Sequence, residues 1–193
     1  MKRITVFCGS SMGNNPIYAE IAYQLGVQLA KENIGLVYGG AKVGLMGKVA
    51  DGVLSLKGEV IGIIPEFLKT KEVVHPKLDD LRTVESMHER KSLMNDLCDG
   101  VIALPGGFGT LEELFEMLTW GQLGLHEKPI ALLNVNGYYD ALITLLDNMV
   151  NEGFLKEINK DMVLVGEDIS TVLNLMRNYK APKVKKWITK EQT

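Results

Sequence analysis

A glycine-rich turn at 105–110, which reads Pro-Gly-Gly-Phe-Gly-Thr, is the stretch of this sequence most typical of ligand binding. Its glycines allow a ligand to approach the backbone closely. Thr110 is expected to begin a helix and to cap it, with Glu113 three positions later as in a capping box. Backbone N–H groups at such a helix start favour an anion, typically phosphate. Taken alone, the turn fits equally well with an ordinary tight connection between a strand and a capped helix.

Two common nucleotide-binding loops do not match this turn. No Lys-Ser or Lys-Thr pair follows the glycines, so the turn is not a Walker loop. The spacing Gly-x-Gly-x-x-Gly of dinucleotide-binding proteins is missing here, and it is also missing at 39–44. An NAD-dependent enzyme is therefore disfavoured.

Arg90 occupies an unusual position for a charged residue. A helix is expected over 87–98, and at about 100° per residue Arg90 falls on its apolar face, in line with Met94 and Leu97. Lys91 lies at the edge of that face. A buried arginine costs free energy unless it is paired. It is either a structural ion pair, a side chain whose stem lies along apolar surface, or a cation directed into a pocket at a phosphate or a carboxylate.

Glu113 is the second charged residue in an apolar setting. On the helix expected over 110–123 it aligns with Met117 and Trp120, whereas Glu112 lies on another side. A carboxylate in such surroundings is a candidate general base or charge stabiliser, and the alternative is a role in the capping box alone. This helix has apolar residues on more than one face, which favours contact with a second copy of the chain.

The elements that must position these residues alternate between strand and helix. Short apolar runs predict strands at 4–8, 35–38, 59–64, 81–84, 101–104, 129–134 and 162–165. Helical patterns are expected at 15–32, 44–56, 87–98, 110–123, 138–151 and 168–176. This order predicts an α/β fold, a Rossmann-like doubly wound parallel sheet with helices on both faces. Glycine-rich turns after three of the strands, at 9–11, 39–40 and 105–110, are expected to meet at one edge of the sheet.

Composition limits the class of protein. The 193 residues are 46% hydrophobic and 23% charged, which suits a single globular domain over 1–180 and excludes disorder for most of the chain. A net charge of −3 argues against nucleic-acid binding. Lysines crowd residues 181–193, which we expect to form a solvated basic tail.

The sequence also bears on cellular location and metals. Cys8 and Cys98 are too few for a disulfide framework, and free thiols suit a reducing cytoplasm. No leader peptide and no apolar run of about 20 residues is found, so we expect a cytoplasmic protein without a membrane segment. His75, His88 and His126 do not show the spacing of metal ligands, and no metal site is expected.

Several motifs in order resemble the Lonely Guy (LOG) family of cytokinin riboside 5′-monophosphate phosphoribohydrolases. The turn and helix start at 105–113 read PGGxGTxxE, and Met-His-Glu-Arg-Lys precedes them at 87–91. Further similarity lies at 6–11, 38–40, 44–47 and 134–138, so that the resemblance covers roughly 3–155. It implies a Rossmann-like fold, usually dimeric, with the active site near the subunit interface. Some family members carry the name lysine decarboxylase, but the sequence offers no basis for a pyridoxal-phosphate site.

The resemblance also implies roles for individual residues. The catalytic pair of the family falls on Arg90 and Glu113. The substrate-binding positions fall on Gly9, Ser10, Glu72, Lys91, Gly106, Gly107, Phe108, Gly109, Thr110, Leu111, Glu112 and Thr119. One departure is Ala41, where many members have a third glycine after Gly39 and Gly40.

The function implied is hydrolysis of the N-glycosidic bond of a purine nucleoside 5′-monophosphate to free base and ribose 5-phosphate, without a metal or redox cofactor. Glu113 would stabilise positive charge on the ribose and position or deprotonate water. Arg90 would orient Glu113 or contact the substrate. The alternative is a non-catalytic nucleotide- or cofactor-binding carrier on the same fold, similar to molybdenum-cofactor carriers. Whether adenine or an N6-modified adenine is preferred is left open by the sequence.

Overall fold

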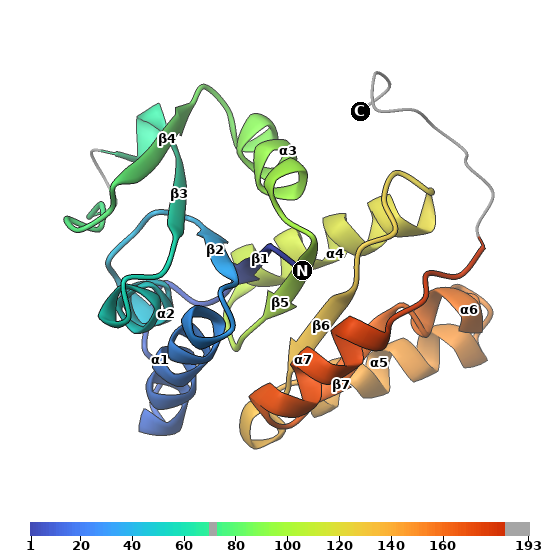
Figure 1. Cartoon of the computed structure of the whole chain (residues 1–193). Coiled ribbons are helices and arrows are strands. Elements are labelled where there is room, and N and C mark those ends of the chain that lie inside the picture. Colours follow the sequence, from blue (N-terminus) through green and yellow to red (C-terminus); the bar gives the residue numbers. More distant parts are fainter. Residues whose placement is uncertain (70–72, 184–193) are drawn as a thin grey trace.

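The computed structural model describes residues 1–69 and 73–183, and its central feature is a parallel sheet with helices on both faces (Figure 1). The strands are β1 (Arg3–Phe7), β2 (Gly35–Tyr38), β3 (Val60–Pro65), β4 (Asp80–Val84), β5 (Gly100–Ala103), β6 (Ile130–Leu133) and β7 (Val163–Gly166). The helices are α1 (Pro16–Lys31), α2 (Gly44–Ser55), α3 (Met87–Leu97), α4 (Phe108–Gln122), α5 (Asp140–Asn151), α6 (Glu157–Lys160) and α7 (Ile169–Asn178). Short 3₁₀ turns form at η1 (Glu66–Leu68) and η2 (Val135–Gly137).

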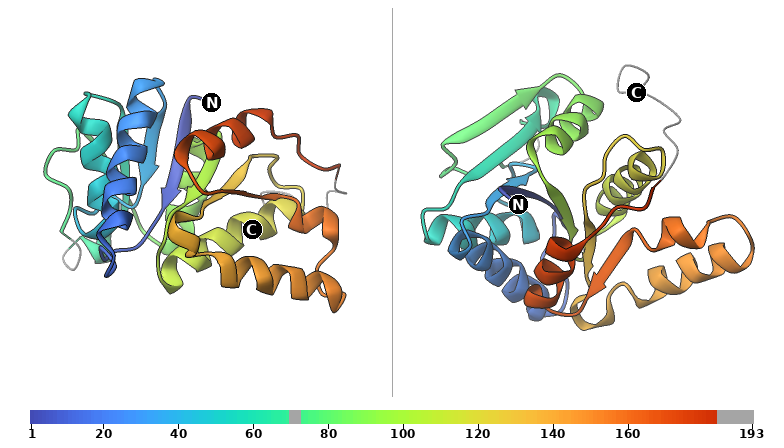
Figure 2. Two further views of the ribbon diagram at one scale, coloured as in Figure 1. Left: turned by 90° about the horizontal axis from the view of Figure 1, so that it is seen from below. Right: turned by 45° about the vertical axis from the view of Figure 1, so that its right-hand side comes forward.

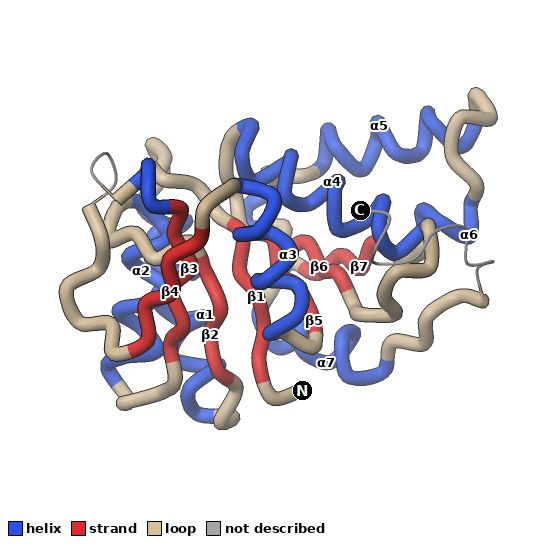
Figure 3. The backbone as a smooth tube through the Cα atoms, turned by 90° about the horizontal axis from the view of Figure 1, so that it is seen from above, coloured by secondary structure: helices blue, strands red, loops and turns tan. Residues whose placement is uncertain are grey.

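The strand order of the sheet fixes where a ligand can bind. The seven strands lie in the order β4-β3-β2-β1-β5-β6-β7, and all neighbours are parallel (Figure 3). The chain builds one half of the sheet outward from β1 and then returns to the other side of β1 with β5. Ile4 accordingly pairs with Leu36 on one side and with Gly100 on the other. In such sheets the carboxyl ends of the strands at this reversal form a crevice. The predicted doubly wound α/β fold is confirmed.

Successive residues of each strand belong alternately to two hydrophobic cores, one on each face of the sheet. On one face, α1, α2 and α7 cover a cluster that includes Ile102 and Leu104 (Figure 2). On the other, α3, α4 and α5 cover a cluster that includes Val101 and Ala103. Because neighbouring residues of a strand point to opposite faces, strands buried on both sides read as continuous apolar runs. This is the pattern from which the strands were predicted.

The start of α4 differs from the prediction. The helix begins at Phe108, two residues before Thr110, and its N-cap is Gly107, which makes no side-chain capping bond. The expected capping box between Thr110 and Glu113 is therefore wrong. Thr110 is instead the third residue of the helix, and its side chain is buried against Gly106. The helix begins after Gly107 without a side-chain cap, so Thr110 does not serve as the N-cap.

Two other elements differ in detail. The helix expected from 138 begins at Asp140, because Asn136 and Gly137 take positive φ angles of 54° and 70° and form a separate turn. The short helix α6 has too few residues to show a periodic pattern and was not predicted. By contrast, the predicted start of α1 is confirmed, since the Asn15 side chain accepts a hydrogen bond from the Ile17 N–H.

Some sequence predictions concern residues at the edge of the described region. Glu72 and most of the basic tail, residues 184–193, lie outside the described residues. The division into a domain at 1–180 and a tail therefore stays a prediction. Cys8 and Cys98 are both buried free thiols. Among the helices that the structure describes, none combines the length and the apolar character needed to cross a membrane.

Candidate active site

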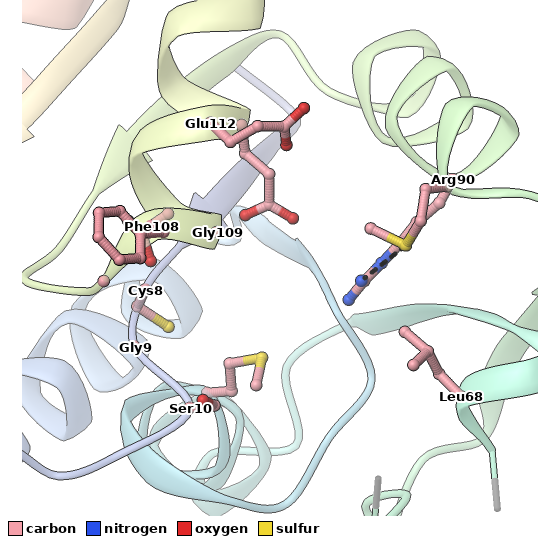
Figure 4. A pocket seen from close by; sticks show the side chains of 13 residues that line it. Cys8, Gly9, Ser10, Leu68, Arg90, Phe108, Gly109 and Glu112 are labelled. Atoms are coloured by element: carbon pink, nitrogen blue, oxygen red, sulfur yellow. Dashed lines mark hydrogen bonds between the residues drawn. The ribbon is translucent and has the colours of Figure 1, made fainter. Parts of the chain in front are cut away.

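A pocket of about 340 Å³ opens at the carboxyl ends of β1 and β5, where the strand order reverses. Arg90 and Leu68 lie on one side of it, and Cys8, Gly9 and Phe108 lie on the other (Figure 4). The pocket is lined by Cys8, Gly9, Ser10, Met46, Leu68, Met87, Arg90, Gly107, Phe108, Gly109, Thr110, Glu112 and Glu113. The turns after β1 and β5 thus meet as predicted, and the predicted pair Arg90 and Glu113 faces the same cavity.

Arg90 is fixed by backbone oxygens of β3 and of the turn that follows β2. It lies on α3 and is only 6% exposed. Its Nε donates to the Ile63 carbonyl at 3.1 Å, and its Nη2 donates to the Gly39 carbonyl at 3.2 Å. Within the ranges 1–69 and 73–183, no salt bridge joins Arg90 to a carboxylate. Neutral carbonyls orient the guanidinium beside the pocket.

Glu113 approaches the pocket from α4, on the other side from α3. Its side chain is partly buried and lines the cavity together with Cys8. Burial and the nearby Glu113 carboxylate raise the pKa of the Cys8 thiol. The thiol therefore stays protonated at neutral pH and does not act as a nucleophile. Glu113 and Glu112 are the two carboxylates of this lining, and Glu112 forms an ion pair with Lys91. A carboxylate is suited to interact with positive charge or with a water molecule.

Lys91 joins α3 to α4 beside the pocket. Its Nζ lies 2.5 Å from Glu112 Oε1 and 2.9 Å from Glu116 Oε2, and its side chain is 11% exposed. Burial works against the charge, but the hydrogen bonds to Glu112 and Glu116 prevail and raise the pKa of Lys91. This ion-pair cluster, Lys91–Glu112–Glu116, connects the helix that carries Arg90 with the helix that carries Glu113. Lys91 does not line the pocket itself, and its predicted contact with substrate stays a prediction.

The glycine loop forms the side of the pocket that is best suited to an anion. Gly107, Gly109 and Thr110 line it at the N-terminus of α4, a helix of 15 residues. Apart from chain neighbours and the backbone of α4 itself, no atom of the described residues lies within 4 Å of the position that a Cβ would take at Gly107 or Gly109, so the backbone there is accessible. Gly106 is required for a different reason, because a Cβ would lie 2.1 Å from Thr110 Oγ1. The accessible N–H groups and the helix dipole favour a phosphate.

Besides Lys91, four residues predicted to bind substrate lie elsewhere in the structure or outside it. Leu111 packs against the core under α4, and the Thr119 hydroxyl donates to the Phe115 carbonyl at 2.7 Å, away from the pocket lining. Gly106 lines a smaller neighbouring cavity. Glu72 is outside the described residues. The roles of all four stay predictions.

Sequence analysis did not assign the apolar part of the lining. Met46, Leu68 and Met87 form it, from α2, η1 and α3. Met87 is the first residue of α3, and nothing in the sequence distinguished it from an ordinary core residue. Leu68 lies in a segment without periodicity, and no pattern in the sequence could have identified it.

The histidines have structural partners. His75 Nε2 lies 3.2 Å from Asp51 Oδ1, and His126 Nε2 lies 2.9 Å from the Met117 carbonyl oxygen. In the described part of the chain, no cluster of three or more His, Cys, Asp or Glu residues could hold a metal ion.

Proteins of similar sequence identify the family. The chain is 44% identical over 189 residues, 98% of its length and 88% of the relative, to the cytokinin riboside 5′-monophosphate phosphoribohydrolase LOG2 of Arabidopsis thaliana. It is 46% identical over 177 residues, 92% of its length and 79% of the relative, to the probable cytokinin riboside 5′-monophosphate phosphoribohydrolase LOGL1 of Oryza sativa subsp. japonica. The chain belongs to the LOG family. Residues 46–176 of this LOG-family chain also match the family described as "possible lysine decarboxylase". Both relatives, however, carry the name of a hydrolase.

A solved structure supports the LOG-type fold. The molybdenum cofactor binding protein of Rippkaea orientalis superposes with a TM-score of 0.69 at 25% sequence identity, covering 92% of this chain and 96% of that protein. Its resemblance in sequence is much weaker than that of the LOG relatives.

Proposed function

We propose that this protein hydrolyses the N-glycosidic bond of a purine nucleoside 5′-monophosphate and releases the free base and ribose 5-phosphate. One observation carries the proposal: an accessible helix N-terminus, Arg90 and Glu113 line the same pocket. The names of the relatives that are 44–46% identical to the chain support the same reaction.

The glycine loop binds the 5′-phosphate in this proposal. N–H groups at Gly107–Thr110 donate to the phosphate oxygens, and the positive end of the α4 dipole adds to the attraction. Ser10 and Gly9 close the other side of the anion site. Glu113 lies one helical turn after Thr110 on the same face of α4, so a phosphate bound at the loop brings the ribose to this carboxylate.

Glu113 and Arg90 then act on the ribose. As the N-glycosidic bond lengthens, its electron pair moves to the base and positive charge develops on the sugar. The Glu113 carboxylate stabilises that charge and positions a water molecule, from which it accepts a proton as oxygen bonds to C1′. Arg90, held by the Ile63 and Gly39 carbonyls, contacts the substrate or orients Glu113. A proton taken up by the leaving nitrogen completes the free base.

The apolar part of the lining suits the base. Met46, Leu68 and Met87 offer thioether and aliphatic groups that pack against a planar purine. Comparison of adenine with N6-isopentenyladenine nucleotides measures which base this surface accepts better.

We also propose that the protein is a cytoplasmic homodimer. Phe108 at the rim of the pocket is 93% exposed, and Trp120 farther along α4 is only partly buried. A second copy that covers this helix would bury both side chains. Light scattering coupled to size-exclusion chromatography measures the mass, and a monomer at micromolar concentration would refute the dimer.

The decisive experiment is incubation of the purified protein with AMP and with isopentenyladenosine 5′-monophosphate, followed by chromatography of the products. We expect release of free base from the monophosphates and much slower release from the matching nucleosides. Glu113→Gln should abolish release. Glu152→Gln is the matched control, because it makes the same change at an exposed position outside the pocket.

The alternative function is a carrier of a nucleotide or cofactor on the same fold, as suggested by the name of the Rippkaea orientalis protein. Binding of AMP without release of base from either nucleotide would favour the carrier and reject the hydrolase. The weaker sequence resemblance to that protein gives the carrier less support than the LOG relatives give the hydrolase.

A further inference from the structure

The three residues that lead from β5 into the glycine loop have their carbonyl groups held from outside the loop. The Leu104 carbonyl accepts a hydrogen bond from Tyr139 Oη at 2.6 Å. The Pro105 carbonyl accepts one from the Gly9 N–H at 3.0 Å. The Gly106 carbonyl accepts one from Tyr138 Oη at 2.6 Å. Two consecutive tyrosines therefore determine the orientation of two peptide groups in this segment.

The turn between β6 and α5 fixes the two tyrosines. The buried Asn134 accepts a hydrogen bond from the Tyr139 N–H and donates one to Asp140, both at 2.7 Å. The Tyr138 ring packs edge-on against Tyr139, with ring centroids 5.1 Å apart, and against Tyr18, with centroids 5.8 Å apart. These ring contacts therefore hold the Tyr138 hydroxyl at the Gly106 carbonyl.

Because of the geometry of a peptide group, the hydrogen bond to the Gly106 carbonyl also determines the direction of the Gly107 N–H. In a trans peptide, the carbonyl of one residue and the N–H of the next point in opposite directions. Because the Gly106 carbonyl faces Tyr138, the Gly107 N–H points away from Tyr138. Gly107 separates two cavities: it lines the active-site pocket, and it also lines a cavity of about 250 Å³ bordered by Tyr138. Tyr138 borders only the smaller cavity, so we infer that the side away from Tyr138 is the side of the active-site pocket.

This peptide also needs an external restraint. It lies between two glycines, which resist rotation of the backbone less than other residues do. A flipped peptide would present a carbonyl oxygen to the 5′-phosphate in place of an N–H group, and the two would repel each other. Tyr139 cannot have the same effect, because the peptide after Leu104 ends at the nitrogen of Pro105, which carries no hydrogen.

We propose that Tyr138 is a positioning residue, whose hydroxyl holds the Gly106–Gly107 peptide with its N–H directed at the 5′-phosphate of the substrate. The proposal rests on the proposed function. It assigns Tyr138 to recognition of the phosphate and not to cleavage of the glycosidic bond.

Tyr138→Phe tests this assignment, because it removes the hydroxyl and keeps the ring stacking. For a nucleoside 5′-monophosphate we expect KM to rise about fivefold to tenfold, the effect of one hydrogen bond, while kcat changes less than about twofold. For the nucleoside without phosphate, kcat/KM should stay unchanged. Tyr18→Phe is the matched control: it removes the same group from the ring next to Tyr138, and the loop carbonyls accept from Tyr138 and Tyr139 instead.

Calorimetry measures binding of ribose 5-phosphate and so tests the role of Tyr138 independently of catalysis. Binding of ribose 5-phosphate should weaken in Tyr138→Phe by the same factor as KM, and binding in Tyr18→Phe should match the unsubstituted protein. An unchanged affinity for ribose 5-phosphate, or equal losses for nucleotide and nucleoside, would overturn the proposal. A protein that releases no base would refute the proposed function, and the calorimetric comparison would still decide the role of Tyr138.

Discussion

Replacement of Gly39 by alanine tests the placement of Arg90 without changing a charged residue. A Cβ at position 39 would lie 2.2 Å from Arg90 Nη2, and real Cβ contacts essentially never fall below 3.0 Å, so the guanidinium must move by 0.8 Å or more. The bond from Nη2 to the Gly39 carbonyl is already 3.2 Å long and would be lost. An unpaired buried carbonyl costs about 1–3 kcal/mol of the free energy of unfolding. For a chain of this size, each kcal/mol lowers Tm by about 2–4 °C.

The assay is urea denaturation together with base release from AMP. We expect Gly39→Ala to lower both the free energy of unfolding and kcat, since Arg90 no longer faces the substrate in its original position. The double variant with Arg90→Lys supplies the control. A lysine lacks the Nη2 atom that meets the new methyl group, so the losses in stability should not add. Additive losses, or a Gly39→Ala protein with unchanged stability and activity, would refute the described contact between Gly39 and Arg90.

Two further predictions concern buried side chains away from the pocket. Burial lowers the pKa of His126 from 6.5 to about 4, so the imidazole is neutral in the folded protein and takes up a proton more readily when unfolded. The contribution of His126 to the free energy of unfolding should therefore be fully present above pH 6.5 and fall towards pH 4 by up to about 1.4 kcal/mol per pH unit. In urea titrations at several pH values, His126→Gln should flatten this dependence. Equal slopes of the free energy of unfolding against pH in the two proteins would contradict the assignment. The buried Tyr38 hydroxyl has no hydrogen-bond partner among the described residues, and Tyr38→Phe should raise the free energy of unfolding by about 1 kcal/mol. A loss of stability would show that the hydroxyl is hydrogen-bonded after all.

The sequence predicted the sheet and the place of the site because both depend on local patterns. Strands buried on two faces read as continuous apolar runs, and the glycine turns after β1 and β5 necessarily meet at one edge. Arg90 was recognisable because a charge on an apolar helix face is costly and requires an explanation. Each of these signals lies within a few residues of the feature that it predicts.

What could not be predicted depends on contacts between distant segments. The carbonyls that hold Arg90 belong to residues 27 and 51 positions away. The pairing of Lys91 with Glu112 and Glu116 requires the relative placement of two helices. The tyrosines at 138 and 139 act on a segment more than 30 residues earlier. The capping box was wrong because Gly107 begins α4 by its backbone conformation, which residue types alone do not reveal.

The central position of β1 has a consequence for biosynthesis. β1 leaves the ribosome before the other six strands of this sheet, and β2 can pair with one of its edges early. Its other edge pairs with β5, which begins only at Gly100. Until then the nascent chain carries an open edge, the kind of surface on which chains aggregate. The addition of β5 covers that edge of β1, and α4 follows with Glu113 at nearly the same point in translation. The open edge then lies on β5 until β6 pairs with it. The growing chain therefore buries the centre of its sheet and brings in Glu113 together, before the sheet is complete.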